Sequence, residues 1–115
     1  MIRKCRLLSA VLAAAFTVGA HAAESGNAQA GHNKAAMCQG CHGIDGYRMA
    51  FPEVYHVPRL GGQHPGYIAK ALQAYKSGAR NNATMRAIAA QLSERDIADL
   101  AAYYGTTDSM TATAK

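Results

Sequence analysis

Apolar side chains at helical spacing predict a helix in the middle of the chain. Ile68, Leu72 and Tyr75 repeat at i, i+4 and i+7, which places them on one face of a helix. Pro65 stands where a first-turn proline is favourable, because its missing N–H needs no partner there. Gly78 follows the last apolar position and is typical of a helix stop.

A second apolar stripe predicts the last helix of the chain. Ser93 is a favourable N-cap, and the carboxylate of Asp96 three residues later lies near the positive end of the helix dipole. Gly105 is expected to end this helix. The stripe consists of Ile97, Leu100, Ala101 and Tyr104.

Two more helices are expected from weaker signals. Gly31, Ala35 and Cys38 repeat at i, i+4 and i+7, and a stripe of such small side chains lets another helix approach closely. A plain solvated helix fits the same spacing. A short helix is expected from a cap at Thr84 through Gln91.

The apolar positions of residues 43–64 follow neither the helical repeat of 3.6 residues nor the alternation of a strand. This segment is rich in glycine and proline and is expected to be irregular with short turns, and no segment of the chain alternates like a strand. It nevertheless carries too many aromatic and aliphatic side chains for a disordered linker. We therefore expect it to pack against a large apolar object that the chain itself does not supply. The predicted fold class is all-α.

The N-terminus has the layout of a secretory signal. Residues 1–6 carry three positive charges, residues 7–20 are almost wholly apolar, and Ala20-His21-Ala22 offers small residues where a signal peptidase cleaves. We expect residues 1–22 to be removed after Ala22, with export to the periplasm. The alternative is an uncleaved membrane anchor, although the apolar run is shorter than the ~20 residues that a spanning helix needs.

Removal of this segment changes the composition. The whole chain has 12 basic and 7 acidic residues, and the loss of three basic residues lowers the formal charge from +5 to +2. No basic stripe remains, which argues against nucleic-acid binding. Residues 23–115 would form one domain, ordered over about 27–105 with a flexible tail at 106–115. Its core is thin, so a disulfide, metal or cofactor is expected to supplement it.

The two cysteines that remain stand in the sequence Cys38-Gln39-Gly40-Cys41-His42. A structural zinc site needs four ligands, and no second cysteine pair exists in the mature part. A thioredoxin-like dithiol needs a βαβ context, which is missing. A disulfide would explain Cys38 and Cys41 but would leave His42 without a role.

Covalent haem uses every residue of this motif. Two thiols at this spacing add across the two vinyl groups of a porphyrin, and the backbone then carries His42 under the iron as its proximal ligand. We therefore predict haem c as the cofactor, with Cys38 and Cys41 as its thioether anchors.

A methionine on the other side of the iron would suit electron transfer. Met37 lies on the same turn as the motif, Met49 is close to it in sequence, and Met110 lies in the tail. Met85 follows a polar loop beyond the long central helix and is the predicted distal ligand. The alternative is that Met85 is an ordinary packing residue.

Three blocks of the sequence support a family resemblance: CQGCH, PRLGGQHPGYIAKALQAYKSGAR and MRAIAAQLSERDIADLAAYY. In this order they resemble the small bacterial class I cytochromes c of the c4 and c-553 branch, over nearly the whole mature chain. The resemblance implies three to five helices wrapped around one covalently attached haem, with the first and last helices crossing. It also implies that the carbonyl of Pro58 accepts from the second ring nitrogen of His42. The segment 47–57 is longer than in many relatives.

The predicted function is that of a periplasmic monohaem one-electron carrier without enzymatic activity, and without a membrane span in its mature form. The alternatives are a haem c subunit of a dehydrogenase or oxidase complex, a peroxidase-like centre, and a haem-free module with a disulfide. Redox partner proteins are expected to dock weakly at the haem edge. The basic residues proposed to surround that edge are Lys34, Lys70, Lys76, Arg80 and Arg86.

Overall fold

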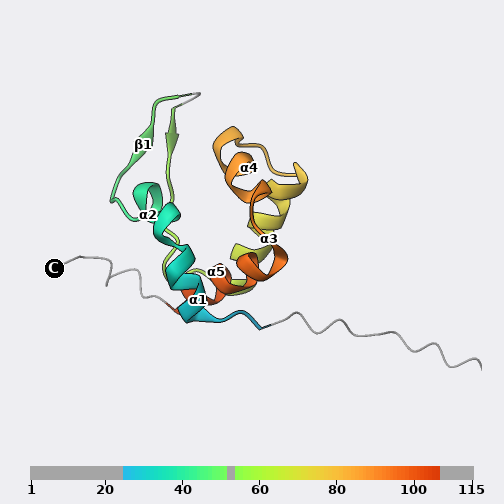
Figure 1. Cartoon of the computed structure of the whole chain (residues 1–115). Coiled ribbons are helices and arrows are strands. Elements are labelled where there is room, and N and C mark those ends of the chain that lie inside the picture. Colours follow the sequence, from blue (N-terminus) through green and yellow to red (C-terminus); the bar gives the residue numbers. More distant parts are fainter. Residues whose placement is uncertain (1–24, 52–53, 107–115) are drawn as a thin grey trace, which may run out of the picture.

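The computed structural model describes residues 25–51 and 54–106, and the predicted signal peptide, Met110 and residues 107–115 lie outside them. The described residues are mostly helical, with one short antiparallel hairpin, so the all-α prediction is confirmed (Figure 1). The helices are α1 (Ala28–Lys34), α2 (Ala36–His42), α3 (Pro65–Ser77), α4 (Ala83–Ala90) and α5 (Glu94–Thr106). The strands are β1 (Arg48–Met49) and β2 (Tyr55–His56).

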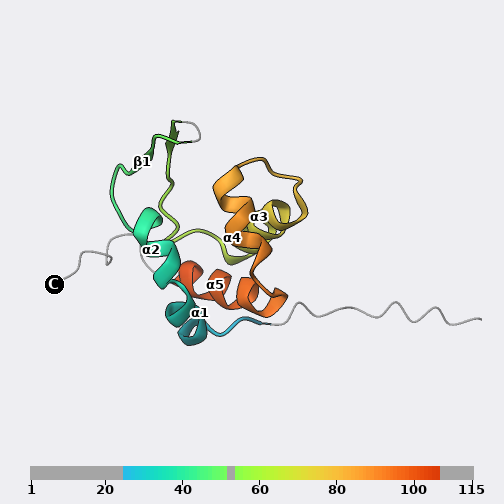
Figure 2. The same cartoon turned by 45° about the horizontal axis from the view of Figure 1, so that its top comes forward.

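The first and last helices lie side by side, as Figure 2 shows at the bottom of the molecule. Gly31 faces α5 so closely that a Cβ there would lie 2.0 Å from the carbonyl oxygen of Asp99 and 2.7 Å from Cβ of Tyr103. Gly26 meets the backbone of Ala98 in the same way, at 1.8 Å. The stripe of small residues therefore marks a helix crossing, as one of the two sequence interpretations predicted.

A buried carboxylate strengthens this crossing. Asp99 is 2% exposed, and its oxygens accept from the backbone N–H of Asn27 at 2.7 Å and from Nζ of Lys34 at 2.8 Å. Nε of Arg95 lies 3.1 Å from the Asp99 oxygen that accepts from Asn27. The hydrogen bond from Lys34, then that from Asn27, lower the pKa of the Asp99 carboxyl. The carboxylate thus connects the start of α1, its end, and α5.

The hydrophobic core lies between α3, α5 and the junction of α1 with α2. Apolar faces meet there because the stripes predicted for α3 and α5 turn toward one another. Cys38 packs against this core and is partly buried. The buried members are Ala35, Ile68, Leu92, Ile97, Leu100, Ala101 and Tyr104.

The helix ends follow local capping chemistry, and two of the ends predicted from the sequence are wrong. Asn82, not Thr84, caps α4, because its side chain accepts from the backbone N–H of Met85 at 2.9 Å. Helix α5 continues through Gly105 to Thr106, so Gly105 does not end it. The expected stop of α3 is confirmed, with Gly78 in the left-handed conformation at φ 83°.

The predicted cap of α5 also forms. The side-chain oxygen of Ser93 accepts from the N–H of Asp96 at 3.1 Å, while the Asp96 carboxylate accepts from the N–H of Ser93 at 2.9 Å. This reciprocal pair starts the helix at Glu94, next to the core residue Leu92.

Residues 43–64 contain the element that the sequence did not predict. Strand β1 pairs with β2 in antiparallel register, Arg48 opposite His56 and Met49 opposite Tyr55. The expectation that no strand forms is therefore wrong for these residues. The hairpin rises on the opposite side of the molecule from α4 (Figure 1). In the described part of the chain, no helix has the length and apolar character needed to cross a membrane.

Candidate functional site

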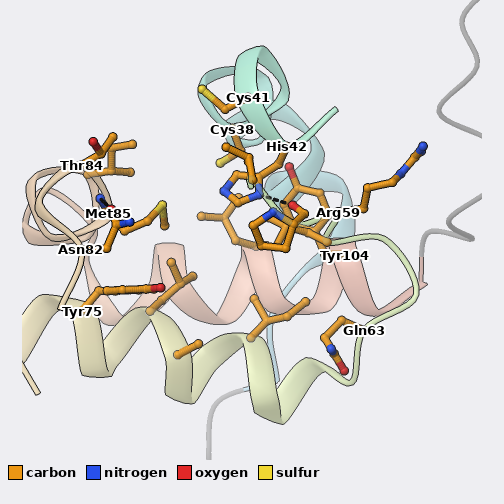
Figure 3. Close-up of a pocket in the computed structure, with 18 of the residues that line it drawn as sticks. Cys38, Cys41, His42, Arg59, Gln63, Tyr75, Asn82, Thr84, Met85 and Tyr104 are labelled. Carbon is orange, nitrogen blue, oxygen red and sulfur yellow. Dashed lines mark hydrogen bonds between the residues drawn. The ribbon is translucent and has the colours of Figure 1, made fainter. Parts of the chain in front are cut away.

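A cavity of about 290 Å³ opens between the hairpin, α2, α3, α4 and α5. Its walls combine segments that are far apart in the sequence, and Figure 3 shows side chains from several of them directed inward. Most of the lining is apolar, as residues 43–64 led us to expect. The apolar members include Met37, Met49, Val57, Leu60, Ile68, Leu72, Ile88, Leu92 and Leu100.

Helix α2 carries both cysteines to this cavity. Cys38 and Cys41 are three residues apart on one helix, so their side chains lie on neighbouring positions of the same face. Both thiols are free in the structure and both line the cavity. Burial raises the pKa of the Cys38 thiol above its ordinary value, against the opposing effect of the Tyr104 hydroxyl.

His42 ends the same helix, and its ring orientation is set by the chain beyond it. Nδ1 of His42 lies 2.5 Å from the carbonyl oxygen of Pro58. A carbonyl oxygen can only accept, so Nδ1 carries the hydrogen of this contact, and in the neutral ring the lone pair is then on Nε2. The contact between His42 and Pro58 that the family resemblance implies is therefore present. It leaves Nε2 as the ring nitrogen that can bind a metal ion in the cavity.

Met85 comes from the opposite wall. It lies in the first turn of α4, and the Asn82 side chain holds its backbone N–H. In Figure 3 the sulfur of Met85 is directed across the cavity toward the His42 ring. Met37 and Met49 also line the cavity, but Met37 shares α2 with His42.

The arrangement does not favour zinc. Among the described residues, no three His, Cys, Asp or Glu side chains come together as metal ligands. Cys38, Cys41 and His42 lie near one another in sequence but do not form such a group. The donor set is instead two thiols, one imidazole nitrogen and one thioether around an apolar space, which is a set suited to a covalent haem.

Sequence reasoning missed a polar cluster at the cavity wall. The Arg80 guanidinium lies 4.8 Å from the centre of the Tyr75 ring, and its Nη1 donates to the Tyr67 hydroxyl at 3.5 Å. Burial raises the pKa of the Tyr75 hydroxyl. Figure 3 shows that hydroxyl directed into the cavity. In the sequence Tyr75 belongs to an apolar stripe, and nothing in the local pattern distinguishes its polar end.

The basic residues expected around the haem edge divide into two groups. Nζ of Lys34 lies 2.7 Å from an Asp96 oxygen as well as bonding Asp99, so its role is to connect α1 with α5. Lys76 donates to the Leu92 carbonyl at 2.6 Å and to Glu94 at 3.1 Å. These two lysines are therefore structural. Arg80 lines the cavity, and Lys70 and Arg86 are exposed.

Comparison with known proteins gives consistent matches. A family profile described as Cytochrome c matches residues 23–108. The cytochrome c-554(548) of Halomonas halodenitrificans is 43% identical over 83 residues, which cover 70% of this chain and 95% of that protein. The thiosulfate dehydrogenase electron acceptor of Stutzerimonas stutzeri (strain A1501) is 41% identical over 98 residues, covering 83% of this chain and 44% of that protein.

Solved structures agree with the sequence matches. The crystal structure of reduced recombinant cytochrome c4 from Pseudomonas stutzeri superposes with a TM-score of 0.53 and 32% identity. The match covers 72% of this chain and 52% of that one. The chain spans between 43% and 48% of the length of the curated cytochromes c4 that it matches.

Proposed function

Because the chain belongs to the cytochrome c family, we propose that it is a periplasmic one-electron carrier with one covalently bound haem c. One observation carries the proposal: His42 and Met85 face each other across an apolar cavity that also holds two free thiols. This donor set fits a haem and its two axial ligands.

Each residue has a defined role in this proposal. Cys38 and Cys41 would form the thioether bonds, Nε2 of His42 would be the proximal ligand, and the Met85 sulfur would be the distal ligand. The group supplies an iron that alternates between the ferrous and ferric states. If His42 and Met85 both bind the iron, no coordination site would be left for a substrate, which favours electron transfer over catalysis.

The surrounding residues would tune this site. The Pro58 carbonyl fixes the His42 tautomer and increases the basicity of Nε2. Asn82 holds the first turn of α4, and with it the position of Met85. The mostly apolar lining would disfavour the additional positive charge of ferric iron and would therefore raise the reduction potential.

A single haem is proposed because the Cys-x-x-Cys-His sequence occurs once in the chain. The relative cytochrome c-554(548) is matched over 95% of its own length, which supports a single domain of this size. Export is supported by the charged, apolar and small-residue regions of residues 1–22.

Optical spectra of the protein expressed in the periplasm test the proposal. We expect mature protein without residues 1–22, haem that stays attached after denaturation, and low-spin spectra in both oxidation states. The oxidised form should have the sulfur-to-iron charge-transfer band. Protein that is exported without covalent haem, or that binds carbon monoxide readily at neutral pH, would contradict it.

A second candidate is a haem subunit that receives electrons within a dehydrogenase complex. The name of the relative from Stutzerimonas stutzeri, an electron acceptor of thiosulfate dehydrogenase, favours this alternative. Purification from the native membrane and periplasmic fractions distinguishes the two, because a subunit would copurify with its enzyme in a fixed ratio.

A further inference from the structure

Two consecutive tyrosines of α5 connect the cavity with the outer surface of the molecule. Tyr104 lines the cavity and is 5% exposed, whereas Tyr103 is only partly buried at the edge of the core. Their ring centroids lie 5.0 Å apart at an interplanar angle of 60°. This spacing is typical of aromatic rings that pack on one another, so one end of the pair faces the cavity and the other lies near solvent.

A third ring extends this pair to α1. The imidazole of His32 lies 5.3 Å from the Tyr103 ring, centroid to centroid, in an edge-on arrangement. His32 itself is exposed. In Figures 1 and 2, α1 lies at the bottom of the molecule, and the hairpin and α4 lie at the top. The three rings therefore lead from the cavity to a surface that lies away from the hairpin and α4.

At its inner end the tyrosine pair reaches the cysteine motif. Nε2 of Gln39, which lies between the two cysteines, donates to the Tyr104 hydroxyl at 3.5 Å. Cys38 packs against the core cluster that contains Tyr104, and its sulfur is within hydrogen-bonding reach of the Tyr104 hydroxyl. Burying a hydroxyl costs free energy that an apolar side chain of similar shape would not. The packing of α1 on α5 therefore does not by itself account for the polar end of Tyr104.

We propose that Tyr104, Tyr103 and His32 form an electron-transfer route from the proposed Cys38 thioether to the surface between α1 and α5. The inference rests on the proposed electron-carrier function. Electronic coupling decays more slowly along bonds and rings in contact than across an empty gap. This route consists of a thioether, one polar contact and two ring contacts. It lets a redox partner at the α1–α5 surface exchange an electron while another protein covers the region around the hairpin and α4.

A photo-oxidisable label on the reduced holoprotein tests the route. A bis(bipyridine)imidazole ruthenium complex is bound to His32 in one preparation and to His56, which is exposed on the hairpin, in another. A light flash with an added electron acceptor oxidises the label to Ru(III), which then takes one electron from the ferrous haem without the formation or cleavage of a bond. The haem absorption gives the rate constant of this step for each labelled position.

Three variants separate the route from general effects on the protein. Tyr103→Leu removes one ring of the route and should lower the rate from the His32 label severalfold, and the conservative change Tyr103→Phe should restore that rate together with the ring. Tyr104→Phe removes the hydroxyl beside Cys38 and should also lower the His32 rate severalfold. The rate from the His56 label should be the same in all three variants, because the hairpin forms a different wall of the cavity.

Two results would overturn the proposal. Equal changes in the His32 and His56 rates would mean that a variant acts on the haem or on the whole fold. A His32 rate that is unchanged in both Tyr103→Leu and Tyr104→Phe would mean that the rings only pack the helix crossing. If Tyr103→Leu fails to fold, Tyr104→Phe still decides, because it keeps the ring. Protein without covalent haem would instead contradict the proposed function itself.

Discussion

Nδ1 of His42 lies 2.5 Å from the carbonyl oxygen of Pro58, a residue 16 positions further along the chain. The contact joins the end of α2 to the segment that follows the hairpin. It also determines that Nε2 is the ring nitrogen able to coordinate a metal ion. The orientation of the imidazole therefore depends on how the chain returns from the hairpin, in addition to the motif that contains His42.

The first prediction concerns this contact. Pro58→Ala keeps the carbonyl but removes the restraint on φ, so the His42–Pro58 hydrogen bond should weaken. We expect faster solvent exchange of the His42 Nδ1 proton, measured by NMR on the reduced protein. The free energy of unfolding should fall by about 0.4–1 kcal/mol because the unfolded chain gains freedom. An unchanged exchange rate would mean that Pro58 does not hold the ring.

The second prediction concerns Met85. Met85→Ala should remove the sulfur-to-iron charge-transfer band of the oxidised protein and allow cyanide to bind at neutral pH. Met49→Ala is the matched control, because Met49 lines the same cavity from the hairpin. It should leave the band in place. A band that survives in Met85→Ala and disappears in Met49→Ala would reverse the assignment of the distal ligand.

The third prediction separates the position of Met85 from its chemistry. Asn82→Ala removes the cap of α4 and should lower the free energy of unfolding by about 1 kcal/mol. The charge-transfer band should also be lost at a lower denaturant concentration than global unfolding, because the first turn of α4 carries Met85. Asn82→Asp preserves the cap and should behave like the original protein in both measurements.

The fourth prediction concerns the crossing of α1 and α5. Gly31→Ala places a Cβ 2.0 Å from the Asp99 carbonyl oxygen, so the helices must separate. We expect a loss of at least about 1–3 kcal/mol in denaturant unfolding. Gly40→Ala adds the same methyl group on α2 where nothing lies within 4 Å, and it should be neutral or slightly stabilising. Equal effects of the two changes would contradict the close approach.

The fifth prediction concerns acid stability. The folded state lowers the pKa of Asp99 below 3.8, so its contribution is present above that value and is lost as the pH falls through the lower folded value. Asp99→Asn should flatten the decline of the melting temperature below about pH 4. Asp45→Asn should not, because Asp45 is 80% exposed in its pair with Arg59 and such pairs contribute little.

The features that the sequence predicts well are those with a local signal. The faces of α3 and α5 follow from their apolar repeats, and the five-residue spacing of the Cys38–His42 motif brings Cys38, Cys41 and His42 to one cavity. The hairpin has no such signal, because its strands have two residues each and their pairing depends on contacts elsewhere. Asn82 and Thr84 are both favourable N-cap residues, and only the structure shows that α4 begins at Ala83, directly after Asn82.

Charged residues show most clearly what the sequence alone cannot predict. Lys34 resembles any solvated lysine in sequence, yet its partner Asp99 lies 65 residues away. No periodicity or motif connects two positions at that separation. The role of Lys34 follows from the close approach of two helices, which is a property of the complete fold.

The pairing of α1 with α5 also has a consequence for the order of events during maturation. Helix α1 directly precedes the cysteine motif, and the surface that α1 packs on comes from the last helix of the described chain. If the chain is exported N-terminus first, as proposed, α1 would have no surface to pack on until α5 has crossed, and the thiols of Cys38 and Cys41 would stay accessible during that time. Covalent haem attachment, if it occurs as proposed, would then precede the packing of α1 on α5 and the closure of the fold.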